Sequence, residues 1–110
     1  MRVFRLKRYI RAMKAMGFGD ADMGEVERSI VAAPESHPMI KGLRGARKAR
    51  ISRPGMGKRG GGRIVYYLAI KGQILALLLA YPKNEKDDLT PDDRKAILRA
   101  IDALAAGAEP

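Results

Sequence analysis

The side chains of this sequence that could do chemistry are mostly cations. The 110 residues include 22 lysines and arginines against 12 aspartates and glutamates, for a formal charge of +10. Residues 36–84 hold no acidic side chain, while acids cluster in residues 20–35 and 85–102. A surface that serves only solubility has mixed charge, so this segment predicts a polyanionic partner, above all a nucleic acid. Its bases are Lys41, Arg44, Arg47, Lys48, Arg50, Arg53, Lys58, Arg59, Arg63, Lys71 and Lys83.

Cleavage of RNA is a reaction that such side chains can support. Attack of a ribose 2′-hydroxyl on the neighbouring phosphate needs a proton acceptor, a proton donor for the leaving 5′-oxygen, and stabilisation of charge on the phosphorane. Arginine and lysine stabilise that developing charge. A lysine crowded by other cations has a lowered pKa and can act as an acid or a base. This reasoning permits a nuclease without selecting one.

Other catalytic constellations are missing from the sequence. There is no cysteine, and the single histidine, His37, lies between Pro34 and Pro38, where a turn residue is the expected role. No His, Cys and carboxylate cluster has metal-site spacing, so we expect neither a metal nor a small-molecule cofactor. The longest apolar run, residues 74–81, is too short to span a bilayer, and the basic N-terminus lacks the apolar region of a secretory signal. We therefore expect a cytoplasmic protein without a membrane partner.

The glycine-rich segment PGMGKRGGGRIVYY, residues 54–67, sets Lys58 and Arg59 among glycines and Arg63 at the start of a strand-like run. Its GMGKRG matches the G-x-G-x-x-G pattern, but the dinucleotide fingerprint opens a helix, whereas this segment opens a strand. A Walker A loop is excluded because Arg59, rather than Ser or Thr, follows Lys58. We expect a flexible loop between two strands, with Lys58 and Arg59 free to meet an irregular anion and Arg63 at a fixed position.

The hydrophobic pattern predicts an α+β fold, with a small antiparallel β-sheet packed against two N-terminal helices and a C-terminal helix in one domain, residues 1–110. The run ILALLLA, residues 74–80, is apolar throughout, as in a strand buried on both faces. Lys71 and Gly72 come just before this run and are typical of a tight turn, which predicts a hairpin with residues 63–70. The expected strands cover residues 3–5, 44–52, 63–70 and 73–80. Three helices are expected. The first ends near Gly17, the second covers residues 23–31 after an Asp20 or Asp22 cap, and the third runs from Thr90 and Pro91 to near Gly107.

Two blocks of sequence resemble a known family. GARKARISRPGMGKRGGGRIVYY, residues 45–67, and YPKNEKDDLTPDD, residues 81–93, are similar to the HigB-type branch of the RelE/ParE toxin superfamily. The order of helices and strands around them also fits, so the resemblance covers most of the chain. It implies a RelE-like sheet against helices and a ribosome-dependent mRNA endonuclease that contacts ribosomal RNA. It also implies a neutralising antitoxin, of the helix-turn-helix kind.

The resemblance also implies roles for individual residues. Lys48 and Arg50 match the family's basic strand positions, and their spacing of two puts them on one face of a sheet. The expected catalytic residues are Lys48, Arg50, Arg63 and Lys83. The expected RNA-binding residues are Arg47, Arg53, Lys58, Arg59 and Lys86.

The identity of the proton acceptor stays open at this point. Relatives in the wider superfamily carry an arginine and a late tyrosine after the last strand, where this sequence has Asn84 and Thr90. Tyr66, Tyr67 and Tyr81 remain, although the first two suit packing equally well. The alternative to an enzyme is a non-enzymatic basic binder of nucleic acid or the ribosome, or a ParE-like inhibitor of DNA gyrase on the same fold.

Overall fold

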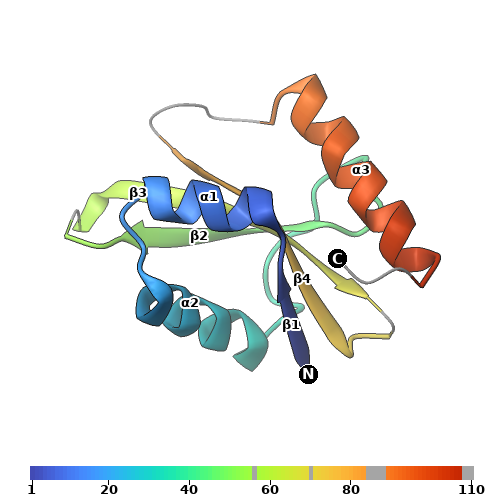
Figure 1. Cartoon of the computed structure of the whole chain (residues 1–110), viewed down its shortest axis with the longest axis horizontal. Helices are drawn as coiled ribbons and strands as arrows, with labels where there is room; N and C mark the ends of the chain where they lie inside the picture. Colours follow the sequence, from blue (N-terminus) through green and yellow to red (C-terminus); the bar gives the residue numbers. More distant parts are fainter. Residues whose placement is uncertain (56, 70, 84–88, 108–110) are drawn as a thin grey trace.

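The computed structural model of the protein describes residues 1–55, 57–69, 71–83 and 89–107, without the side chains of residues 57–60. It has the predicted α+β fold, in which helices cover a four-stranded sheet of strand order β1-β4-β3-β2 (Figure 1). In chain order the elements are β1 (Arg2–Arg5), α1 (Lys7–Ala15), α2 (Asp20–Ala32), β2 (Arg47–Arg53), β3 (Gly57–Ala69), β4 (Ile74–Pro82) and α3 (Pro91–Ala105).

The sheet is mixed rather than wholly antiparallel. Strands β2, β3 and β4 pair antiparallel as expected, but β1 pairs parallel to β4, with Arg2 opposite Ile74. A parallel partner needs a long crossover connection. Here two helices and two further strands separate β1 from β4 in the chain, so β1 is free to join in either direction. The sequence pattern marked β1 as a strand but held no signal for its direction.

Strand β4 is the buried centre of the sheet, as its apolar run predicts. Leu75, Leu77 and Ala80 pack in a cluster with α1 and α2, while Ala76 and Leu79 pack in a second cluster with α3. In Figure 1, α3 lies apart from the α1–α2 pair. The β3–β4 turn also follows the prediction. Lys71 and Gly72 both have positive φ, 52° and 82°, which a type I′ hairpin turn requires.

The two long helices begin at different kinds of cap. Helix α3 starts as predicted, since the Thr90 hydroxyl accepts from the Asp93 N–H at 3.1 Å and the Asp93 carboxylate accepts from the Thr90 N–H at 3.0 Å. Helix α2 starts earlier than predicted, at Asp20, with Gly19 as its N-cap. The Asp22 carboxylate accepts from the Gly19 N–H at 2.8 Å, so this aspartate acts from inside the first turn instead of capping it.

The glycine-rich segment is mostly strand, which corrects the expectation of a long flexible loop. Strand β3 begins at Gly57 and pairs with β2 and β4 through Gly62. A Cβ at Gly62 would lie 3.2 Å from the Met16 sulfur and 3.3 Å from both Ile51 Cγ1 and the Tyr81 carbonyl oxygen. Gly62 therefore allows the close approach of α1's end to the sheet, which is a different use of glycine from flexibility.

A partly buried ion pair ties the N-terminal elements together. The Arg5 guanidinium on β1 donates to both carboxylate oxygens of Glu27 on α2, at 2.6 and 2.9 Å. This hydrogen bond raises the pKa of Arg5. The Tyr9 hydroxyl on α1 donates to the same carboxylate at 3.5 Å, and burial raises the pKa of Tyr9. One carboxylate thus joins β1, α1 and α2.

Replacing this carboxylate is expected to destabilise the fold. Glu27→Gln removes the charge that both hydrogen bonds from Arg5 use, and should lower the free energy of unfolding by about 1.5–3 kcal/mol. Urea unfolding at neutral pH measures it. Glu35→Gln makes the same change at an exposed position, and its urea midpoint should equal that of the wild type within experimental error. Equal midpoints for the two variants would contradict the role given to Glu27.

Candidate functional site

The structure gathers three predicted catalytic cations at one end of the sheet. Arg50 on β2 lies directly opposite Arg63 on β3, so their side chains share one face. Lys83 follows β4 and donates its backbone N–H to the Gly61 carbonyl at 3.0 Å. We call the resulting hollow of about 230 Å³ the cationic pocket. Its lining is Arg50, Ile51, Ser52, Gly61, Arg63 and Lys83.

The fourth predicted catalytic residue, Lys48, lies beside the pocket but does not line it. It is opposite Val65 and two residues from Arg50, on the same face of β2. The strand rise of about 3.3 Å per residue puts the two backbone positions some 6–7 Å apart. A side chain as long as lysine spans such a gap, so Lys48 is within reach of a ligand held by Arg50.

The charges of the cationic pocket are uncompensated in the described part of the chain. Ion pairs there join Arg5 to Asp20 and Glu27, and Arg44 to Asp102, and none involves Arg50, Arg63 or Lys83. Arg63 is oriented by one hydrogen bond of 3.0 Å to the Gly62 carbonyl. Cations held together without a carboxylate form a site for an anion, and phosphate suits the forked donors of arginine.

Two predicted RNA-binding residues donate hydrogen bonds to backbone carbonyls. The Arg47 guanidinium donates to the Glu35 and His37 carbonyls, at 3.0 and 2.7 Å, and so holds the segment between α2 and β2. Arg53 donates to the Met16 carbonyl at 3.4 Å. The side chains of Lys58 and Arg59, and the whole of Lys86, lie outside the described residues. For all five, RNA binding remains a prediction.

The tyrosines divide between the two faces of the sheet. Tyr66 packs on the α1–α2 face, donates to the Pro34 carbonyl at 2.6 Å, and has a pKa raised by burial. Tyr67 packs against the α3 cluster. Tyr81 is opposite Arg63 on β4 and 2% exposed. Of the three, Tyr81 is nearest to the cationic pocket in the strand register, while Tyr66 has a structural role.

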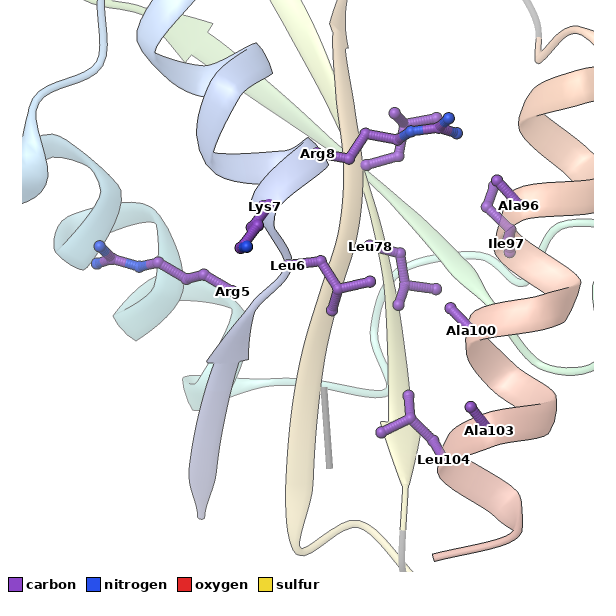
Figure 2. Close-up of a pocket in the computed structure, with 11 residues that line it drawn as sticks. Arg5, Leu6, Lys7, Arg8, Leu78, Ala96, Ile97, Ala100, Ala103 and Leu104 are labelled. Carbon is purple, nitrogen blue, oxygen red and sulfur yellow. The ribbon is translucent and has the colours of Figure 1, made fainter. Parts of the chain in front are cut away.

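A larger, apolar pocket was not foreseen from sequence. It has a volume of about 570 Å³, lies between the start of α1, β4 and α3, and shares no residue with the cationic pocket (Figure 2). We call it the apolar groove. Its apolar lining is Leu6, Leu78, Leu79, Ala96, Ile97, Ala100, Ala103 and Leu104, and its basic lining is Arg5, Lys7 and Arg8. The alanines at 96, 100 and 103, at helical spacing beside Ile97, are the signal that could have indicated it.

Comparison with known proteins identifies the family. The family model described as the RelE toxin of the RelE/RelB toxin–antitoxin system matches residues 1–109, and the chain belongs to this family. A solved structure of an E. coli RelE toxin mutant in the free state is similar in fold. It is 12% identical, with a TM-score of 0.55, and the match covers 91% of this chain and 96% of that one. The chain is thus a toxin of a toxin–antitoxin system, with an antitoxin as its partner. No described helix is long and apolar enough to cross a membrane.

The geometry of the cationic pocket predicts the salt dependence of RNA binding. For single strands, the logarithm of the binding constant falls with the logarithm of salt concentration with a slope of about 0.7 per neutralised phosphate. Arg63→Ala should therefore reduce the slope by about 0.7 in titrations of a short RNA. Arg99→Ala, an exposed arginine on α3 outside the pocket, is the control and should not change it. An unchanged slope for Arg63→Ala would exclude phosphate contact by this residue.

Proposed function

We propose that this toxin is a ribosome-dependent mRNA endonuclease of the HigB type, formed by a single domain that acts in the cytoplasm. The single observation that carries the proposal is the convergence of Arg50, Arg63 and Lys83 on one pocket. These cations come from β2, from β3 and from the residue after β4, and lie together only in the folded sheet. The two sequence blocks that resemble HigB-type toxins contain all three, which supports translated mRNA as the substrate and ribosomal RNA as an additional contact.

The proposed reaction uses the charges of the pocket. The ribose 2′-oxygen forms a bond to phosphorus, the bond from phosphorus to the 5′-oxygen breaks, and the 2′-proton passes to a base while the leaving oxygen takes a proton from an acid. The phosphorane carries more negative charge than the bound phosphodiester. Arg50 and Arg63 stabilise this additional charge and so lower the barrier. Lys83 and Lys48 are the amines placed to transfer protons. The reaction runs on cations of the chain and requires no metal.

Arginine substitutions separate catalysis from binding. Arg63→Ala and Arg50→Ala should each slow cleavage of translated mRNA on the order of 10²–10³-fold while ribosome binding falls modestly, because a positioned charge acts mainly on the transition state. Primer extension on a translated reporter mRNA measures cleavage, and pelleting with ribosomes measures binding. Arg59→Ala, which departs from the family pattern, should retain cleavage, and Lys58→Ala should fall between.

Two outcomes of these assays would contradict the proposal. Folded Arg50 and Arg63 variants that remain as toxic as the wild type would show that the site is wrongly assigned. Wild-type protein that arrests growth with intact mRNA and altered DNA supercoiling would indicate a gyrase inhibitor instead. Arrest with neither effect would indicate a toxin that only binds nucleic acid or the ribosome.

The antitoxin is the partner for which the apolar groove is suited. We propose that an amphipathic segment of a helix-turn-helix antitoxin places its apolar face on Leu78, Ile97 and Leu104 and its acidic residues near Lys7 and Arg8. Opposite charge at the rim of an interface steers association and fixes register. The groove and the cationic pocket share no residue, so the surface that anchors the antitoxin is separable from the surface that binds RNA.

A charge in the groove is expected to release the toxin from its antitoxin. Ala103→Glu puts a carboxylate among apolar side chains and should weaken the complex at least about tenfold, because a buried unpaired charge is costly. Ala105→Glu makes the same change on α3 outside the groove and should bind normally. Isothermal titration with the purified antitoxin measures both. Equal affinities for the two variants would place the interface elsewhere.

A further inference from the structure

A second polar pocket lies on the opposite face of β2 from the cationic pocket. It has a volume of about 270 Å³ and is bounded by α2, β2 and the segment that carries His37. Ile30 and Ala49 contribute apolar surface, and Glu25, Ser29 and His37 contribute polar groups. We call it the α2–β2 pocket. Nothing in the reaction proposed above uses it.

Strand β2 connects the two pockets, because its consecutive residues Arg50, Ile51 and Ser52 line both. Strand β2 is at the edge of the sheet, so its outer side has no neighbouring strand. A ligand can therefore extend from one face of the sheet to the other around this strand. An RNA chain with one phosphate at Arg50 would have to pass round only a single strand to bring a neighbouring nucleotide to the α2–β2 pocket.

The backbone of Arg50 adds hydrogen-bonding groups at this edge. The Lys48 N–H points away from β3, because it donates to the Pro38 carbonyl at 3.1 Å. Backbone groups two residues apart on a strand point the same way, so the Arg50 N–H and C=O also point outward. Within the described residues they have no backbone partner. They thus present one donor and one acceptor beside the pocket, as the edge of a base does.

The chemistry of the α2–β2 pocket suits a base and not a phosphate. The Glu25 carboxylate repels phosphate but accepts hydrogen bonds from an exocyclic amino group. Apolar and aromatic surface packs against the flat face of a base. His37 is held in place, since its ring meets Tyr66 edge-on at 6.1 Å and its carbonyl accepts from Arg47 at 2.7 Å. Arg47 therefore shapes this pocket through the backbone.

We propose that the α2–β2 pocket binds a nucleobase that carries an amino group, one nucleotide from the cleaved phosphate, and so sets the sequence preference of cleavage. Adenine, cytosine and guanine offer such a group and uracil does not. Glu25 and His37 are the specificity-determining residues. The inference rests on the proposed endonuclease function, because it assumes that RNA is bound at Arg50.

The test is the ratio of cleavage at matched sites. Translated reporter mRNAs are made in pairs that differ at one nucleotide next to a cleaved bond, on one side or the other. One member of each pair has uracil at that position and the other has a base with an amino group, and the ratio compares their cleavage. For wild-type protein we expect one position at which uracil lowers cleavage about tenfold, the size of one good base contact. Glu25→Gln should bring this ratio close to one, because an amide also pairs with uracil, and His37→Ala should reduce it. Glu35→Gln is the matched control and should keep the wild-type ratio.

Each outcome of this test either supports or overturns the base-binding subsite. A ratio that falls in Glu25→Gln and His37→Ala, with cleavage of the best substrate retained, supports the subsite. Ratios equal to the wild-type value in both variants overturn it, and so does a uniform loss of cleavage on all mRNAs, which would show a structural role. Wild-type protein that cleaves without any base preference overturns the subsite alone. Wild-type protein that does not cleave overturns the endonuclease proposal together with the subsite.

Discussion

The burial of β4 on both faces is the constraint on which the rest of the structure depends. Side chains from Ile74 to Tyr81 are buried, and they alternate between the α1–α2 cluster and the α3 cluster. Because the strand is apolar on both faces, its register in the β3–β4 hairpin is set by the Lys71–Gly72 turn and by the fit of large and small side chains in each cluster. At Leu78 the alternation breaks, since Leu78 and Leu79 belong to the same cluster and the β3–β4 register shifts there. Beyond this bulge, Tyr81 comes opposite Arg63.

The cationic pocket brings like charges together, and the packing around β4 holds the strands in place against their repulsion. Placing Arg50, Arg63 and Lys83 together costs electrostatic free energy, and none of the ion pairs among the described residues involves these three cations. The two arginines lie on strands paired along their length, so repulsion does not separate their backbones. Proteins commonly carry such locally unfavourable arrangements at functional sites, where the rest of the fold offsets them.

The parts that the sequence predicted are those governed by local physics. The apolar run of residues 74–80 predicted a strand buried on both faces, Lys71 and Gly72 predicted the hairpin turn, and Thr90 predicted the start of α3. The shared face of Lys48 and Arg50 followed from their spacing, and Arg63 joined them because β2 and β3 pair in the observed register. These features each depend on a few neighbouring residues.

The parts that the sequence did not predict depend on packing between distant elements. The glycines of residues 57–62 indicated a loop, but pairing with β2 and β4 makes Gly62 part of a strand, where the missing side chain leaves room for Met16 and Ile51. The direction of β1 depends on β4, some seventy residues later in the chain. The apolar groove and the α2–β2 pocket form between elements whose relative placement no local pattern contains. For the same reason His37, judged a turn residue from sequence, also lines a pocket.

The parallel pairing of β1 with β4 has a consequence for how the molecule comes into being. Strand β1 has no partner until residues 74–82 have been synthesised, since Arg2 pairs with Ile74. Contacts between such distant residues form late and slow folding. The same delay applies to the cationic pocket, whose Lys83 follows β4. A nascent chain of this toxin therefore cannot form the cationic pocket until the ribosome has added Lys83.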